Sequence, residues 1–321
     1  MGLVNVQIIR CQVKEELKTE NKLTPKILAV GGGKGGAGKS VFSTIMAFWL
    51  ARMGHRTVLM DVDLGGANLH TLLGIKSPDR TLNDFITRKF GELEDICIDT
   101  SEKNLRLISG ASDVLSLANP HFSQKIKLMT HLSRLDADYV VLDLGAGTSF
   151  NVLDFFLIAH KKIIVLTPEP TSIQNAYIFV RNTVYRKLSR LSSKNPSLQA
   201  LIKIAMDPKN ILKIRTIKEL FQFIEESDEK NVIEVLKKEI GDVHLGVVTN
   251  MVKNEKEENA GRIVQIVAEK YLTIPSTDLG SVSYDKHIHK MVSNMTPLIN
   301  LDQSSQAFGN IYEIASKLSK E

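Results

Sequence analysis

The chain has 321 residues, a length that suits one large domain or two small ones. Apolar residues make up 43% of it and the net charge is +5, so the composition is that of a globular protein that is only mildly basic. It lacks an uninterrupted apolar run of about 18 residues, and we expect no membrane-spanning helix. The charged opening residues lack the apolar core of a secretory signal. The two cysteines, Cys11 and Cys97, form no CxxC pair, which disfavours disulfides and cysteine metal sites and favours a cytoplasmic location.

Short apolar runs alternate with amphipathic segments from Lys26 onward. Residues 1–25 are expected to be a polar lead-in and residues 26–321 a single domain. A helix is predicted over residues 40–54, and β-branched apolar runs predict strands at 27–31, 56–61, 105–110, 139–145, 162–168 and 244–250. This alternation predicts an α/β fold with a mostly parallel, doubly wound sheet flanked by helices.

Residues 181–242 interrupt the alternation. They contain no clear strand, and we interpret them as a helical insertion of two or three helices. Tyr177, Phe179 and Tyr185 interleave with its first basic residues and are expected in the protein core rather than in a base-stacking platform. A solvated face is favoured for its basic side chains, with nonspecific DNA binding or docking of an acidic partner as alternatives. These side chains are Arg181, Arg186, Lys187, Arg190, Lys194, Lys203, Lys209, Lys213, Arg215 and Lys218.

A glycine-rich loop lies between the first predicted strand and the first predicted helix. Its sequence, GKGGAGKS at residues 33–40, matches the phosphate-loop pattern G-x-x-x-x-G-K-[ST]. Glycines let successive N–H groups curl around a phosphate, and the following helix adds its positive N-terminal dipole. Lys39 places an ammonium at the β- and γ-phosphates, and the Ser40 hydroxyl can ligate Mg²⁺. The predicted nucleotide site comprises Gly33, Lys34, Gly35, Gly36, Ala37, Gly38, Lys39, Ser40 and Val41.

Polar side chains end several of the later strands. Asp61 and Asp63 follow the second predicted strand, Asp143 lies near the end of another, and Asn250 ends a late one. The carboxyl ends of parallel strands face the ligand in such sheets, so these side chains are candidates for the same site. Phosphoryl transfer to water needs an acceptor that orients the water near the γ-phosphate.

The second lysine of the loop, Lys34, gives the pattern K-G-G-x-G-K-S. This pattern resembles the deviant Walker A family, which includes MinD, ParA, the nitrogenase iron protein and the Mrp-type cluster carriers. The resemblance implies that Lys34 reaches across a dimer interface to the nucleotide of the partner. An added cation there would help to neutralise charge that develops during phosphoryl transfer.

The same resemblance assigns roles to the strand-end residues. It implies that Asp63 positions the attacking water and that Asp143 holds Mg²⁺ through water. It also implies that Asn250 reads adenine, since an amide offers a donor and an acceptor. The switch residues would be Asp61, Gly145 and Gly147, because the glycines leave the segment free to respond to the γ-phosphate.

Two segments are similar to the FlhG/FleN branch, the MinD-like ATPases that limit flagellar number. They are TPEPTSIQNAY at 167–177 and DVDLGGANLHTLLGI at 61–75. The chain departs from that branch in four features. Asn175 replaces an aspartate, and the partner-stimulating motif is missing from the lead-in. The further basic, amphipathic C-terminal helix that binds lipid in that branch is not expected here, and the helical insertion is additional. An apolar stripe near the C-terminus is expected to pack in the core, which makes membrane binding doubtful; it comprises Ile311, Ile314, Ala315 and Leu318.

The resemblance as a whole implies a regulatory switch. The chain would bind and hydrolyse ATP with Mg²⁺, form an ATP-dependent homodimer, and act on an unidentified protein partner. It would set the placement or number of a cellular structure such as the flagellum, in the cytoplasm or recruited to a pole. The alternatives are a ParA-like partitioning ATPase that binds DNA and a nucleotide-binding scaffold with weak hydrolysis. A cluster carrier is disfavoured, because neither cysteine lies in a glycine-rich loop.

Overall fold

The computed structural model describes residues 24–63, 66, 68–110, 122–207, 209–227, 230–302 and 304–320. Most of the predicted lead-in, including Cys11, lies outside these residues. In the part of the chain that the model describes, no helix is both long and apolar enough to cross a membrane.

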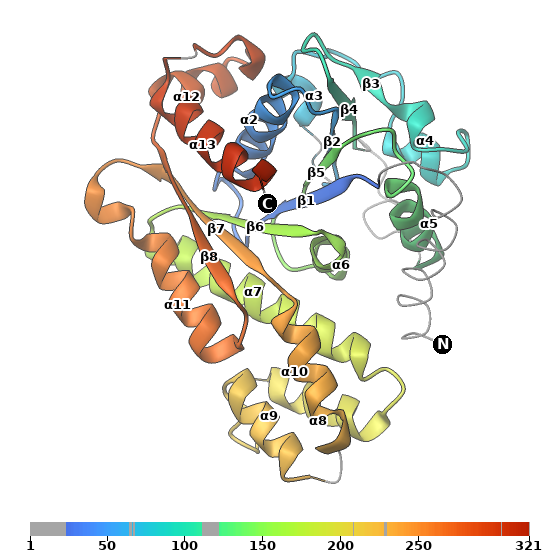
Figure 1. Cartoon of the computed structure of the whole chain (residues 1–321), viewed down its shortest axis with the longest axis vertical. Helices are drawn as coiled ribbons and strands as arrows, with labels where there is room; N and C mark the ends of the chain where they lie inside the picture. Colours follow the sequence, from blue (N-terminus) through green and yellow to red (C-terminus); the bar gives the residue numbers. More distant parts are fainter. Residues whose placement is uncertain are drawn as a thin grey trace.

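An eight-stranded sheet runs through the molecule in the order β3-β4-β2-β5-β1-β6-β7-β8 (Figure 1). Only the β3–β4 pair is antiparallel, as the alternation of strands and helices predicts. The strands are β1 Lys26–Gly31, β2 Thr57–Asp61, β3 Ile98–Asp99, β4 Leu105–Ile108, β5 Tyr139–Asp143, β6 Lys161–Leu166, β7 Leu245–Val252 and β8 Ser276–Ser283.

Helices flank both faces of this sheet. In Figure 1, α2, α12 and α13 lie on one side, and α6, α7 and α11 lie on the other. The helices are α2 Lys39–Arg52, α3 Leu69–Leu72, α4 Leu82–Ile86, α5 Phe122–Leu132, α6 Phe150–Ile158, α7 Pro170–Leu191, α8 Pro196–Met206, α9 Ile217–Glu225, α10 Ile233–Gly241, α11 Ala260–Leu272, α12 Lys286–Ser293 and α13 Gln306–Lys320. The predicted doubly wound α/β fold is therefore confirmed.

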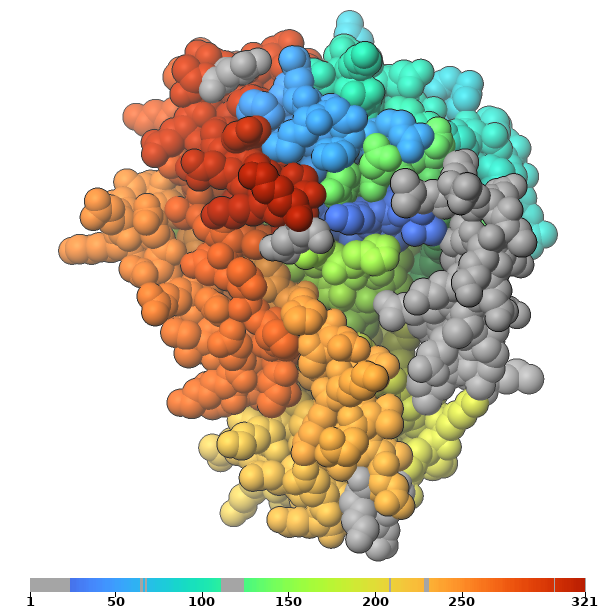
Figure 2. All heavy atoms as spheres, viewed as in Figure 1, coloured from blue at the N-terminus to red at the C-terminus, as the bar shows by residue number. Residues whose placement is uncertain are grey.

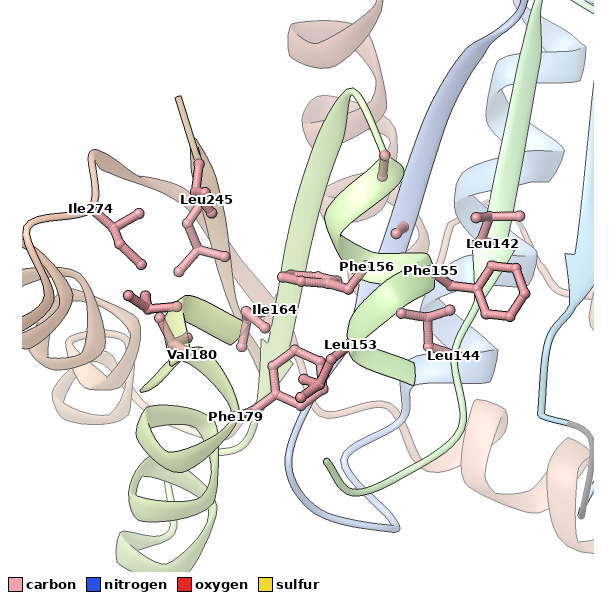
Figure 3. Close-up of a cluster of buried hydrophobic side chains, with 14 of the residues drawn as sticks. Leu142, Leu144, Leu153, Phe155, Phe156, Ile164, Phe179, Val180, Leu245 and Ile274 are labelled. Carbon is pink, nitrogen blue, oxygen red and sulfur yellow. The ribbon is translucent and has the colours of Figure 1, made fainter. Parts of the chain in front are cut away.

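The two faces of the sheet carry separate hydrophobic clusters, because successive strand residues point to opposite faces. In β1, Ile27 and Ala29 join one cluster, while Leu28 and Val30 join the other. The first cluster lies under α6 and α7, where Phe156 and Phe179 meet edge to face at a centroid distance of 5.0 Å (Figure 3). This packing joins the helix after β5 to the helix after β6.

The second cluster holds α13 against α2, and Figure 2 shows the two helices in contact on the surface. The indole Nε1 of Trp49 in α2 donates to the carbonyl oxygen of Phe308 at 2.9 Å. The apolar stripe predicted to pack in the core is buried here, from Ile311 to Leu318. These side chains are already covered by protein, so this face of α13 offers no apolar surface to a bilayer.

The stretch between β6 and β7 contains α7 and the smaller helices α8, α9 and α10. These three lie at the lower end of the molecule in Figure 1, beyond α7. Phe179 and Tyr185 of α7 are fully buried, as predicted, and Tyr177 is half-buried. We call α8, α9 and α10 the helical lobe.

Candidate functional site

The glycine-rich loop is packed on one side and open on the other. A Cβ added at Gly33 would lie 2.1 Å from the carbonyl oxygen of Asn175 in α7, and one added at Gly38 would lie 2.3 Å from Asn250 Nδ2. A Cβ at Gly35 or Gly36 would have no atom within 4 Å. Gly36 and Gly38 have φ of +79° and +81°, a region that favours glycine. The loop thus rests on α7 and β7 and exposes its Gly35–Gly36 backbone, which fits an anion cradle.

Lys39 is the first residue of α2, and its ammonium points back into the loop. Nζ donates to the carbonyl oxygen of Lys34 at 3.2 Å, and the residue is only 6% exposed. Burial lowers the pKa of Lys39, and the charges of Asp143 and Asp63 oppose that shift. The ammonium therefore sits near two carboxylates on the inner side of an open loop. Val41, which follows Ser40, is half-buried.

Two carboxylates lie side by side at the carboxyl edge of the sheet. Asp61 and Asp143 are paired in register across β2 and β5. Burial, reinforced by the neighbouring charge of Asp143, raises the pKa of Asp61 to about 7. Burial raises the pKa of Asp143 to about 6, against hydrogen bonds from Ser40 and Ser43. Two neighbouring carboxylates with raised pKa values favour a bound cation.

The residues around Asp143 fit a Mg²⁺ ion. The hydroxyl of Ser43 donates to Asp143 Oδ1 at 2.8 Å, and the Ser40 hydroxyl also bonds this carboxylate. The described residues contain no cluster of three or more His, Cys, Asp or Glu side chains suited to a metal. A phosphate-loop site does not need one, because Mg²⁺ keeps several waters and binds one or two protein oxygens plus substrate phosphates. Sequence reasoning missed Ser43, although its position one turn after Lys39 was an available signal.

Asp61 also shapes the segment that follows β2. Its carboxylate accepts backbone hydrogen bonds from Asp63 at 3.1 Å, Asn68 at 3.0 Å and Leu69 at 3.2 Å. The Asp63 carboxyl group packs against Gly145, where an added Cβ would lie 2.9 Å from Asp63 Cγ. Gly147 has a φ of +92°. The structure thus brings Asp61, Asp63 and Gly145 into contact between β2 and β5, and among the described residues it shows no such contact for Gly147.

Lys34 is exposed at the tip of the loop. Its Nζ donates to Thr171 Oγ1, at the start of α7, at 3.4 Å. Thr171 lies in the TPEPTS segment, where Ser172 Oγ accepts from the N–H of Thr167 at 3.0 Å. This segment therefore supports both the Lys34 side chain and, through Asn175, the backbone of Gly33.

Asn250 lies at the end of β7 beneath the loop. Its Nδ2 donates to the carbonyl oxygen of Ala37 at 2.9 Å, and the residue is buried. One amide proton of the residue predicted to read adenine is thus used to hold the loop. A contact between Asn250 and an adenine base would therefore have to use the Oδ1 atom and the second amide proton of Asn250.

We expect Asn250→Ala to lower the free energy of unfolding by about 1 to 2 kcal/mol, because it leaves the Ala37 carbonyl without its buried donor. Urea denaturation of the nucleotide-free protein measures this. Asn254→Ala is the control, since its Nδ2 bonds Glu257 at an exposed position and its loss should cost less than about 0.5 kcal/mol. Equal effects of the two changes would show that the Asn250 contact does not stabilise the loop.

The chain resembles known proteins over the region that contains this site. Residues 24–183 match a family described as ParA: NUBPL iron-transfer P-loop NTPase. The antiactivator FleN of Pseudomonas aeruginosa is 36% identical over 158 residues, 49% of this chain and 55% of FleN. The flagellum site-determining protein YlxH of Helicobacter pylori is 31% identical over 171 residues, 50% of this chain and 55% of YlxH. The chain thus spans about half the length of these curated relatives.

Solved structures extend the likeness of the fold to nearly the whole chain. The septum site-determining protein MinD of Pyrococcus horikoshii, complexed with Mg-ADP, has a TM-score of 0.63 and 18% identity over 92% of this chain and 96% of MinD. MinD in the MinC:MinD cell division complex of Aquifex aeolicus has a TM-score of 0.58 and 18% identity over 92% of this chain and 96% of its own. From its sequence relatives, its phosphate loop and its fold, the chain belongs to the ParA/MinD family of P-loop NTPases.

Proposed function

We propose that this protein hydrolyses ATP with Mg²⁺ and works as a nucleotide-controlled dimer switch. The observation that carries the proposal is the buried ammonium of Lys39, which lies near Asp63 and Asp143 beneath an open glycine-rich backbone. A buried cation facing two carboxylates and an anion cradle suits the triphosphate and Mg²⁺ of a bound nucleotide.

Each residue of the site has a role in this proposal. Ser40 and Asp143 would hold Mg²⁺, Asp143 through water, and the ion would neutralise charge on the phosphates. Lys39 binds the β- and γ-phosphates, and Asp63 orients the water that attacks the γ-phosphate. Asn250 reads the adenine with its remaining amide atoms. Asp61, Gly145 and Gly147 link the γ-phosphate to the shape of the dimer face.

Lys34 is the residue that would connect nucleotide binding to dimer formation. Its side chain is exposed, and its ammonium donates to the exposed hydroxyl of Thr171 within its own chain. An exposed pair of this kind is weak, so Lys34 can exchange it for phosphate oxygens of a partner at little cost. The dimer would then form only when both chains carry ATP.

We further propose that the switch sets the placement or number of a cellular structure through a protein partner, in the cytoplasm or at a pole. Two relatives support this role by name, an antiactivator and a flagellum site-determining protein. A ParA-like role in DNA binding receives less support, because several basic side chains of α7 are bound within the protein; Arg186 and Arg190, for example, both contact Asp154.

Light scattering of the full chain with ADP and with Mg-ATP tests the switch. We expect a monomer with ADP, a lasting dimer with Mg-ATP for Asp63→Ala, and no dimer for Lys39→Ala. Asp63→Ala should bind ATP but fail to orient water, whereas Lys39→Ala removes the ammonium that holds the phosphates. If Asp63→Ala stays monomeric in saturating ATP, or if every sample has the same mass, the nucleotide-controlled dimer is wrong and a nucleotide-binding scaffold becomes the better interpretation.

A further inference from the structure

Two groups of basic residues after β6 differ in their contacts. Those of α7 are bound within the protein: Arg181 donates to the Met206 carbonyl at 2.9 Å, Arg186 pairs with Asp154, and Lys187 lies 3.2 Å from Glu239. The second group runs from the end of α8 to the first turn of α9 and is exposed; it consists of Lys209, Lys213, Arg215 and Lys218. We call residues 207–218 the lobe loop; Pro208 lies outside the described residues.

A buried asparagine braces the lobe loop from inside. Asn210 Nδ2 donates to the carbonyl oxygens of Asp207 at 2.8 Å and Ile214 at 2.7 Å, and its Oδ1 accepts from the N–H of Ile214 at 3.0 Å. These bonds satisfy the side-chain amide of Asn210 and link Asp207 to Ile214 within the loop. The backbone that carries the exposed side chains of the loop is therefore held by internal hydrogen bonds.

Ile211 stands at the outside of this braced loop and is 87% exposed. Single exposed apolar residues are ordinary on protein surfaces. Here the neighbour Asn210 is fixed in place, so the loop holds the isoleucine outward. Among the described residues, none packs over this side chain to shield it from solvent. Its transfer from water into an apolar phase would therefore lower the free energy of the system.

The acidic side chains nearest to Ile211 in the chain accept hydrogen bonds from the backbone of the lobe loop. Asp207 Oδ1 accepts from the backbone N–H of Lys209 at 2.9 Å. Glu219 Oε2 accepts from the N–H of Arg215 at 2.6 Å and also from that of Thr216 at 3.2 Å, the second bond being part of a capping box. Within the part of the chain that the structure describes, none of Lys209, Lys213, Arg215 and Lys218 forms an ion pair. The same loop thus carries one exposed apolar side chain and four exposed cations that form no ion pair among the described residues.

We propose that the lobe loop docks on an anionic lipid bilayer, with Ile211 in the acyl boundary and the four cations at the headgroups. Anionic bilayers attract clustered basic side chains and bury an apolar residue among them. A nucleic acid would satisfy the cations but leave Ile211 in water, because single-strand platforms use aromatic rings. The helical lobe, which carries the loop, forms one end of the molecule (Figures 1 and 2). The contact is independent of the nucleotide site.

Vesicle flotation of the full chain tests the docking. We expect binding to phosphatidylcholine vesicles that contain about 30% phosphatidylglycerol and none to pure phosphatidylcholine. Ile211→Ser should weaken binding about tenfold, and Lys209→Gln with Arg215→Gln about thirtyfold. The matched controls are Val235→Ser, at an apolar position of α10 that is 59% exposed, and Lys76→Gln with Lys286→Gln, at exposed cations elsewhere; both should bind like wild type.

Fluorescence gives a direct measure of insertion, because the chain has a single tryptophan, Trp49, packed against α13. The indole introduced by Ile211→Trp should shift to shorter wavelength on the anionic vesicles, and that introduced by Val235→Trp should not.

Three results would each overturn the proposal. The first is a lack of binding to the anionic vesicles. The second is binding that Ile211→Ser leaves unchanged, which would place the contact elsewhere on the chain. The third is tight binding to a DNA duplex with no spectral shift of Ile211→Trp on vesicles, which would make nucleic acid the partner.

Discussion

Replacing Asp154 with asparagine is expected to lower the free energy of unfolding by about 3 kcal/mol at neutral pH. Asp154 is on α6, and its side chain is only 5% exposed. It lies 3.0 Å from Lys125 of α5, 2.7 Å from Arg186 and 3.5 Å from Arg190 of α7. Removing its charge leaves three cations gathered at a poorly solvated point, with no carboxylate between them. Urea denaturation of the nucleotide-free protein measures the loss.

The stabilisation of the fold by Asp154 should decrease as the pH falls. Although burial works against it, hydrogen bonding and charge from Arg186 hold the pKa of Asp154 below its ordinary value. Its ionised form therefore stabilises the fold above the pKa of the unfolded chain, about 4, and that contribution disappears as the pH falls through the lower folded value. The difference between wild type and Asp154→Asn should be full at pH 7 and should narrow in acid.

Asp136→Asn provides the control for this charge. Asp136 lies 2.6 Å from Arg56, but both side chains are about half exposed, so solvent screens the pair. The change should cost less than about 0.5 kcal/mol. A similarly small loss for Asp154→Asn would mean that the three cations relax into solvent and that the cluster does not hold the helices together.

Replacing Gly33 with alanine should strongly damage the phosphate loop. The new methyl group would lie 2.1 Å from the carbonyl oxygen of Asn175 and 2.5 Å from its carbon, both of which are backbone atoms of α7. Neither can rotate away, so the loop or the helix must shift. We expect a loss of about 3 kcal/mol in stability and about a hundredfold in the rate of ATP hydrolysis.

Gly35→Ala is the matched control within the same loop. A Cβ at this position meets no atom within 4 Å, and Gly35 is not among the residues with positive φ. The nucleotide-free variant should unfold within about 0.5 kcal/mol of wild type. Thermal and urea denaturation of Gly33→Ala and Gly35→Ala measure this difference in stability. Equal stabilities of the two variants would disprove a steric clash between the loop and α7.

Local patterns in the sequence were sufficient to predict the frame of the fold. Each predicted strand is present, because strands buried on both faces produce apolar runs that stand out from their surroundings. Strand β8 was not predicted. It lies at the edge of the sheet and pairs only with β7, and its sequence, STDLGSVS, is largely polar and contains a glycine. An edge strand with one neighbour can remain polar, so apolar periodicity does not reveal it.

The candidate site was predictable where its residues are contiguous or end parallel strands. Asp61 and Asp143 were expected at one edge of the sheet and are direct neighbours in register. The bond from Asn250 to Ala37 joins residues that are 213 positions apart, and no local pattern encodes such a contact.

The Asp154 cluster was also missed, because its members come from three helices. Arg186 and Arg190 were expected on a solvated face, yet both pair with Asp154. A signal for it was present, since a lone aspartate in the apolar segment FNVLDFFLI needs a partner, and Arg186 and Arg190 are four residues apart on one helix face.

Helix α7 connects the phosphate loop to the helical lobe as a single rigid rod. It has 22 residues, which corresponds to a length of about 33 Å. Near the start of α7, the backbone of Asn175 packs against Gly33 of the phosphate loop. Further along, Arg186 forms an ion pair with Asp154 of α6, and the adjacent Lys187 forms one with Glu239 of α10. These contacts tie the phosphate loop, α6 and α10 to one helix, and the bond from Arg181 to the Met206 carbonyl ties the end of α8 to it as well. A displacement of α7 at the nucleotide end would therefore be transmitted to the helical lobe at the far end of the molecule.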